Sequence, residues 1–245
     1  HGKYLVFFNN DTVPQPQWLN PLVSEVEEHQ EVGVVGSKLL FADGSVQHAG
    51  VVFMRSHLSP YHIYQAASST IPAVNQRREF QAVTAACMLI RREVFGEVQG
   101  FDESFINGFE DVDLCLKIRE KGYYVIYQPR SVVHHLESQT SGRKDRDEYN
   151  SRLLKERWGT HWWLGDEDLH YYQDGFKLVG GVQDIKFATQ LKPLNDVYDR
   201  ATWVHVAATQ AAALKKDWDS VKRELRLADS WPNHRFVLSW GAIVA

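Results

Sequence analysis

Strand-length apolar runs alternate with a helix-length amphipathic segment at the start of the chain, and this alternation constrains the fold more than any other sequence feature. Tyr4–Phe8 is a continuous apolar run, and Val32–Leu40 is apolar except for Ser37 and Lys38; both are typical of buried strands. Between them, Pro16–Gln30 places its apolar residues at helical spacing. Strands that alternate with helices predict an α/β domain in which helices pack on the faces of a sheet.

The same pattern continues through the middle of the chain. Strands are predicted at Phe80–Arg91 and Tyr123–Val133, and helices at Arg92–Glu97, Asp111–Lys121 and Tyr149–Trp158. Asp43 and Gly44, flanked by apolar residues, predict a hairpin. Ser56–Gln76 shows no periodicity and is predicted to be a loop.

From about Lys192 onward, the sequence no longer alternates between strand and helix patterns. Asp196–Ala213 and Trp218–Asp229 have the pattern of amphipathic helices, and no second copy of the pair recurs at a fixed period. We therefore predict two domains, residues 1–180 and a helical appendage at 190–245. The boundary between them is placed between Asp174 and Lys192.

Charge, hydropathy and cysteine content exclude several kinds of partner and predict a location in the cell. The formal net charge is −4 over 245 residues and no basic run is present, so neither nucleic acid nor an anionic membrane surface is an expected partner. No apolar stretch approaches the ~18 residues of a transmembrane segment, and the first residues do not resemble a signal peptide. Cys87 and Cys115 lie in apolar segments, which indicates reduced core thiols. The expected location is the cytoplasm, including the inner face of the membrane.

A polar cluster, Asn9-Asn10-Asp11, follows the first apolar run directly. Such residues close strands by hydrogen-bonding the nearby backbone, and this cluster by itself favours a turn. Ligands of open α/β sheets, however, bind beyond the carboxyl ends of the strands, so a ligand site is the alternative.

Two further clusters contain side chains that can act as a general base or bind a metal. Glu110, Asp111 and Asp113 crowd the start of a predicted helix, where acids interact favourably with the helix dipole, or where one of them can act as a general base. His134 and His135 end a predicted strand and are either structural or metal-binding. Imidazole together with a carboxylate at another strand end would suit Mn²⁺ or Mg²⁺.

Several motifs, in order, resemble the family 2 glycosyltransferases, which have the GT-A fold. They are FFNNDT, VGVVGSKLLFADGSVQHAGVVF, VTAACMLIRREVF, QGFDESF, GFEDVDLCLKIREKGY and SVVHH, within Gly2 to Trp163. The resemblance implies a partial GT-A (nucleotide-diphospho-sugar transferase-like) mixed sheet with flanking helices, plus a small C-terminal α-helical appendage. It also implies a nucleotide-sugar donor, a saccharide or other hydroxyl acceptor, and a divalent metal, Mn²⁺ or Mg²⁺.

The resemblance also implies roles for individual residues. Asn9-Asn10-Asp11 is similar to the Asp-x-Asp motif, with Asp11 as a metal ligand and Asp111 as the catalytic base. His134 matches the second metal ligand, and His135 is the alternative if the register slips by one residue. The donor side would comprise Asn9, Asn10, Ala85 and Ala86, and the acceptor side Gly100, Phe101, Asp102, Glu110 and Trp163. Trp158, Trp162 and Trp163 could stack on a sugar, although core packing is the commoner use of such residues.

The family's fold begins with strands for the nucleotide base and ribose, about a hundred residues ahead of the motif that here starts at Asn9. The sequence therefore predicts the C-terminal part of the catalytic domain of an inverting transferase, with polysaccharide biosynthesis as the expected process. We expect the chain alone to be inactive, and Tyr4–Phe8 to pair with a missing N-terminal half or to self-associate. The alternatives are a non-catalytic carbohydrate-binding or interaction module derived from a glycosyltransferase and, with less support, a metal-dependent phosphohydrolase.

Overall fold

The computed structural model describes residues 2–54, 58–136, 146–159, 165–178, 191–193, 212 and 217–228. The chain divides into two compact units, His1–His161 and Trp162–Ala245. The boundary predicted between Asp174 and Lys192 falls within the second unit, partly outside the described residues, and it stays a prediction.

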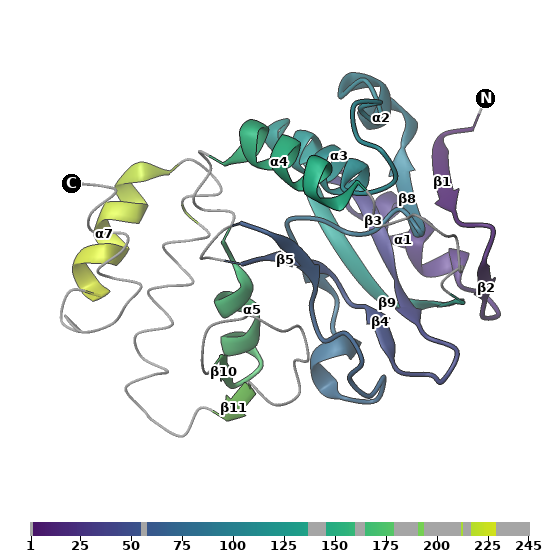
Figure 1. The fold of residues 1–245 in the computed structure, drawn as a ribbon, viewed down its shortest axis with the longest axis horizontal. Helices are drawn as coiled ribbons and strands as arrows, with labels where there is room; N and C mark the ends of the chain where they lie inside the picture. Colours follow the sequence, from purple (N-terminus) through teal and green to yellow (C-terminus); the bar gives the residue numbers. More distant parts are fainter. Residues whose placement is uncertain are drawn as a thin grey trace. The chain divides into compact units, whose positions relative to one another are not determined.

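The first unit contains a seven-stranded mixed sheet (Figure 1). Its strands are β1 (Tyr4–Phe8), β2 (Thr12–Pro14), β3 (Val32–Leu40), β4 (Val46–His48), β7 (Arg78–Glu79), β8 (Cys87–Arg91) and β9 (Tyr124–His135). The order is β1-β8-β3-β9-β2, with β4 beside β3 and β7 beside β9. β3 and β9 are parallel, and the other neighbouring pairs are antiparallel.

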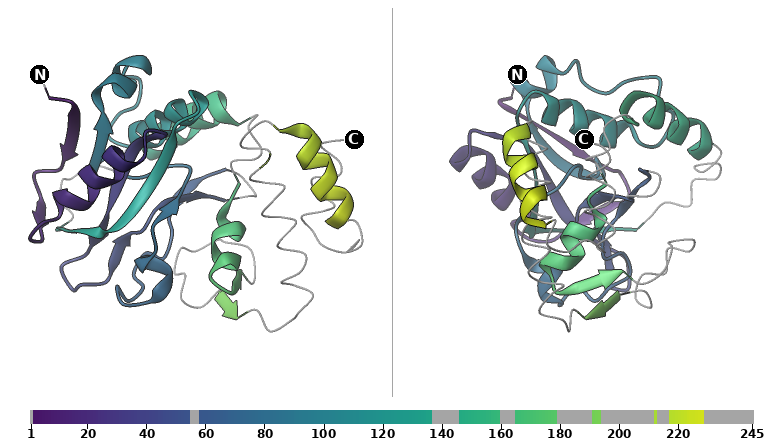
Figure 2. Two further views of the ribbon diagram at one scale, coloured as in Figure 1. Left: turned by 180° about the vertical axis from the view of Figure 1, so that it is seen from behind. Right: turned by 90° about the vertical axis from the view of Figure 1, so that its left-hand side faces the viewer.

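Helices cover both faces of this sheet (Figure 2), which confirms the predicted mixed α/β class. The helices that contact the sheet are α1 (Leu19–Glu28), α2 (Arg92–Glu97) and α3 (Glu110–Glu120). The unit also contains α4 (Asp147–Trp158) and a 3-10 turn, η1, at Pro72–Asn75. A separate small sheet pairs β5 (Val51–Phe53) with β6 (Pro60–His62).

The central strand β3 is mostly apolar because both of its faces are covered. Val35 belongs to the core cluster that contains Leu22 and Val26 of α1. Gly36, the next residue, points to the opposite face and lies against Val83. Every residue of β3 is buried, Ser37 and Lys38 included, which confirms the predicted buried strand.

We expect Gly36→Ala to destabilise the fold. A Cβ at this position would lie 2.5 Å from the Cβ of Val83, and overpacking of a core typically costs ~1–3 kcal/mol in the free energy of unfolding. Denaturant unfolding measures this change. The matched control is Gly96→Ala in α2, where an added Cβ meets nothing within 4 Å. An unchanged unfolding midpoint for Gly36→Ala would contradict the packing described here.

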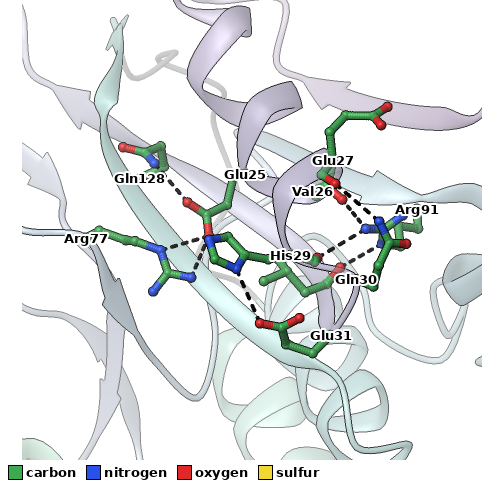
Figure 3. Close-up of polar contacts among 10 residues, drawn as sticks. Glu25, Val26, Glu27, His29, Gln30, Glu31, Arg77, Arg91 and Gln128 are labelled. Atoms are coloured by element: carbon green, nitrogen blue, oxygen red, sulfur yellow. Dashed lines mark hydrogen bonds and ion pairs between the residues drawn. The ribbon is translucent and has the colours of Figure 1, made fainter.

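Two buried charged groups fix α1 in place (Figure 3). The carboxylate of Glu25 accepts hydrogen bonds from the guanidinium of Arg77, at 2.5 and 2.8 Å, and from Gln128 Nε2 at 3.0 Å. At the C-terminal end of α1, the buried guanidinium of Arg91 donates to the carbonyl groups of Val26, His29 and Val32. A cation at this end satisfies carbonyl groups that have no partner within the helix and interacts favourably with the helix dipole.

Most predicted elements of this unit are present, with three differences. The segment predicted as a loop, Ser56–Gln76, contains β6 and η1, because β6 pairs with β5 and needs no periodicity of its own. In Phe80–Arg91 the strand β8 begins only at Cys87. β1 is an edge strand rather than a buried one, and Val6 and Phe8 are 41% and 39% exposed. Cys87 and Cys115 are free, buried thiols, as predicted.

In the second unit, helix α5 (Glu167–Gln173) precedes an antiparallel pair of strands, β10 (Phe176–Leu178) and β11 (Leu191–Pro193). Helix α7 (Trp218–Ala228) corresponds to the helix predicted at Trp218–Asp229. The helix predicted at Asp196–Ala213 lies outside the described residues, apart from Ala212. Among the helices that the structure describes, none combines the length and apolar character that crossing a membrane requires.

Candidate functional site

The ends of several strands bring the predicted site residues together. Thr12 of β2 pairs with His135 of β9, which places the preceding residue, Asp11, at the end of β9. The backbone N–H of Leu136 donates to the carbonyl of Asp11 at 2.9 Å. On the other side, the N–H of Asn9 donates to the carbonyl of Ala86 at 3.0 Å, just before β8. The polar cluster after β1 therefore bridges the ends of β8 and β9.

Asp11 and His135 face each other at this point. Asp11 Oδ1 lies 3.2 Å from His135 Nε2, and the histidine is 4% exposed. Nδ1 of the same ring lies 2.7 Å from Gln47 Oε1, an acceptor, so we assign a proton to Nδ1. Nε2 faces the carboxylate of Asp11, and two acceptor atoms at this distance require a proton or a cation between them. This is the arrangement of a metal-binding histidine whose second nitrogen donates to a neighbouring oxygen.

His134 makes different contacts. Its Nδ1 lies 3.3 Å from the carbonyl oxygen of Phe41, and its Nε2 lies 3.3 Å from Gln15 Nε2. Successive residues of a strand point to opposite faces, so only one of the two histidines can accompany Asp11. The structure brings His135, the alternative in the sequence assignment, to Asp11.

The three acids at the start of α3 have separate environments. Asp111 is half-buried, and its Oδ2 accepts the N–H of Ala85 at 3.0 Å while Oδ1 accepts the N–H of Val112 at 2.8 Å. Asp113 is fully buried, and its Oδ1 accepts from Arg157 at 2.7 Å and from Trp158 Nε1 at 2.9 Å. Asp113 therefore holds the fold together, whereas Asp111 lies beside the predicted donor-side segment.

Ala85 and Ala86 connect Asp111 to the Asp11–His135 pair. Ala85 binds the carboxylate of Asp111, and Ala86 binds the backbone of Asn9. The side-chain Nδ2 of Asn9 lies 3.4 Å from His135 Nε2. A continuous series of contacts thus joins the predicted base, the donor-side residues and the predicted metal ligands.

Two residues of β4 support this series and were missed from sequence. Gln47 orients His135, and the buried His48 accepts the N–H of Thr84 at Nε2, 3.3 Å away. His48 Nδ1 lies 3.0 Å from the carbonyl oxygen of Ser37, so we assign its proton there. Burial, and secondarily His62, holds the pKa of His48 well below its usual value, which keeps the ring neutral. The predicted hairpin at Asp43-Gly44 was the only sequence signal for the position of these residues.

The residues predicted on the acceptor side form a compact loop before α3. Phe101 packs edge-on against Phe7, with ring centroids 4.9 Å apart. The carbonyl of Gly100 accepts from Lys117 Nζ at 2.8 Å. Asp102 accepts from the N–H of Ser104 and forms a 2.8 Å salt bridge with Arg157, and these contacts lower the pKa of Asp102 to about 2.

Glu110 and Trp163 complete the predicted acceptor-side set, and Trp158 was a further candidate for stacking on a sugar. Trp158 is buried and packs in the fold, and Glu110 is half-buried at the first position of α3. Trp163 lies outside the described residues.

The donor atoms at Asp11 and His135 suit a divalent cation that also binds phosphate. Within the described part of the chain, no three His, Cys, Asp or Glu side chains gather as a metal site. Mg²⁺ is commonly held by one or two protein ligands together with substrate phosphates and water. A carboxylate and an imidazole therefore fit Mg²⁺ or Mn²⁺ when phosphate oxygens complete the coordination.

Comparison with known proteins adds a family match. The model of the family described as "Glycosyltransferase like family 2" matches residues 1–159. The uncharacterized protein y4gI of Sinorhizobium fredii is 36% identical over 171 residues, which are 65% of this chain and 19% of that protein. The O-antigen biosynthesis protein RfbC of Myxococcus xanthus is 39% identical over 140 residues, covering 55% of this chain and 11% of RfbC.

A third relative is the N-acetylglucosaminyl-diphospho-decaprenol L-rhamnosyltransferase of Mycobacterium tuberculosis, 25% identical over 150 residues, covering 57% of this chain and 49% of the relative. The chain thus spans between 11% and 49% of the length of these three proteins. Among solved structures, GalNAc-T7 with UDP, GalNAc and Mn²⁺ has a TM-score of 0.49 and 18% identity, covering 69% of this chain and 34% of its own. The mannosyltransferase PcManGT of Pyrobaculum calidifontis, with GDP-Man and Mn²⁺, has a TM-score of 0.38 and 16% identity, covering 100% of this chain and 56% of its own.

Proposed function

The chain belongs to glycosyltransferase-like family 2, and from this membership we propose that its protein transfers a sugar from a nucleotide-diphospho-sugar to a hydroxyl group of a saccharide or other acceptor. The observation that carries the proposal is the series of contacts from Asp111 through Ala85, Ala86 and Asn9 to the Asp11–His135 pair. It brings a candidate base and a candidate phosphate-binding site to the same end of one sheet.

Asp11 and His135 would hold Mn²⁺ or Mg²⁺. The cation would act as a Lewis acid on the diphosphate and stabilise the negative charge that develops as this group leaves. The protein's own contribution is orientation: Gln47 fixes the ring of His135, and the pairing of Thr12 with His135 fixes Asp11. The support for this assignment is the 3.2 Å approach of the two side chains and the chemistry of their donor atoms.

Asp111 would accept the proton of the acceptor hydroxyl. As that proton moves to the carboxylate, the acceptor oxygen bonds to the anomeric carbon and the bond from this carbon to the diphosphate oxygen breaks. A single displacement of this kind inverts the anomeric carbon. The N–H groups of Ala85 and Val112 hold the carboxylate in one orientation, and a positioned base contributes typically ~10²–10⁴-fold to the rate.

We place this reaction in the cytoplasm, where reduced thiols such as the buried Cys87 and Cys115 are maintained. The relatives named for O-antigen biosynthesis and for rhamnosyl transfer to a diphospho-decaprenol carrier support an acceptor that belongs to polysaccharide assembly.

The test uses the full-length protein with a panel of nucleotide-sugars, with Mn²⁺ or Mg²⁺ and with simple saccharide acceptors. We expect metal-dependent release of nucleoside diphosphate, including slow release when water replaces the unknown acceptor, and loss of release when a chelator is added. Mass spectrometry of the products identifies the transferred sugar. Donor release that persists undiminished in chelator would contradict the metal assignment, and failure of every donor to bind with metal present would contradict glycosyl transfer itself.

A further inference from the structure

The loop that leads into α3 has an unfavourable backbone conformation. Asn107, Gly108 and Phe109 have φ values of 54°, 159° and 68°, and Phe109 immediately precedes the helix. Positive φ is uncommon for residues with a side chain, and it persists only where surrounding contacts enforce it. Side chains of α4 contact this loop.

Asn150 of α4 holds the loop by both atoms of its side-chain amide. The N–H of Ile106 donates to Asn150 Oδ1 at 3.1 Å, and Asn150 Nδ2 donates to the carbonyl of Ile106 at 2.8 Å. Asn150 is fully buried, so water cannot replace either hydrogen bond in the folded protein. A Cβ at Gly108 would lie 3.5 Å from Asn150 Nδ2, which shows that the tip of the loop packs on α4.

Arg157 lies two turns further along α4. It binds one carboxylate near the start of the loop and another in α3. Its Nη2 lies 2.8 Å from Asp102 Oδ2 near the start of the loop. Its Nη1 lies 2.7 Å from Asp113 Oδ1 in the first turn of α3. The neighbouring Trp158 donates to the same oxygen of Asp113 at 2.9 Å. Asp111 is therefore bracketed in sequence by Ile106 and Asp113, both of which are bound by α4.

We propose that Asn150 and Arg157 are positioning residues, which hold the loop before α3 so that the carboxylate of Asp111 keeps its place beside Ala85. The predicted effect on turnover rests on the proposed function, whereas the predicted effect on the loop itself does not. Asp11 and His135, in contrast, are placed by the pairing of β2 with β9 and by their contact with each other. Loss of the contacts between α4 and the loop should therefore displace Asp111 and lower turnover. The affinities for the donor and for the metal should be unchanged.

Asn150→Ala in the full-length protein tests the proposal by two measurements. Hydrogen exchange followed by mass spectrometry should show faster exchange at residues 106–111 and unchanged exchange in β3. In the donor-release assay, kcat should fall by ~10²-fold, the loss that a misplacement of about 1 Å can cause, while KM for the donor is unchanged. The matched control is Glu156→Ala, also in α4. The side chain of Glu156 is exposed, and its carboxylate lies 3.8 Å from Arg152 Nε. It should alter neither measurement.

Arg157→Lys provides a second variant that keeps the positive charge but cannot bridge both carboxylates at once. It should give the same split between kcat and KM with a smaller loss. Wild-type exchange at residues 106–111 in Asn150→Ala would overturn the proposal, as would faster exchange with unchanged kcat. Faster exchange throughout β3 in both variants would show a merely structural role and also overturn it. Absence of any turnover in the wild-type protein would refute the proposed function, while the exchange data would still decide whether α4 holds the loop.

Discussion

Asp111→Asn in the full-length protein is expected to lower kcat by at least ~10²-fold, because the amide cannot accept the proton of the acceptor hydroxyl. The substitution preserves shape, and the remaining oxygen can still accept one of the two backbone N–H groups, from Ala85 or Val112, that bind Asp111. The free energy of unfolding should therefore change little. Donor release measures the first effect and denaturant unfolding measures the second.

The neighbouring acids are the controls for this variant. Glu110→Gln alters a half-buried acid at the first position of the same helix, predicted on the acceptor side, and should lower kcat for donor release less than Asp111→Asn does. Asp113→Asn removes the charge that Arg157 and Trp158 surround, so it should lower stability before it affects chemistry. If Asp111→Asn kept more than about a tenth of the wild-type turnover, Asp111 would not be the base, given the rate contribution usual for such a group.

The parts of the fold that were predictable from sequence are those with a strong local signal. β3 is a run of nine residues that are all buried, and its composition required no knowledge of its partners. α3 was predicted from its periodicity and from Gly122, which has φ of 90° just beyond the C-terminal end. β6 was missed because its pairing with β5 is a tertiary contact that leaves no periodic pattern in three residues.

The candidate site was also predictable from sequence only in part. Sequence placed Asp11 and a histidine at strand ends, but the choice between His134 and His135 depends on the register of β9 against β2. A shift of one residue exchanges the two faces of a strand, and no local feature reports it. Likewise, single polar residues such as Gln47 and Asn150 gain their importance from one or two specific hydrogen bonds between distant segments.

His135→Ala is expected to abolish the metal-dependent part of donor binding, whereas His134→Ala is expected to leave it close to wild type. His135 Nε2 lies 3.2 Å from Asp11 Oδ1, while His134 contacts Gln15 and the backbone of Phe41. Loss of a residue that only orients a metal ligand typically costs ~10–100-fold in metal affinity, so loss of the ligand itself should cost at least as much.

The two variants differ by one position in the same strand, which makes each the control for the other. Titration of the full-length protein with Mn²⁺ in the presence of a nucleoside diphosphate, followed by calorimetry, measures the affinity directly. Asp11→Asn should weaken binding as His135→Ala does, and Gln47→Ala should show the smaller, ~10–100-fold loss of a residue that orients the ring. A larger effect from His134→Ala than from His135→Ala would mean that the register of β9 at the site differs from the one described. Equal affinity in all four variants would place the cation, and with it the leaving diphosphate, away from the ends of β2 and β9.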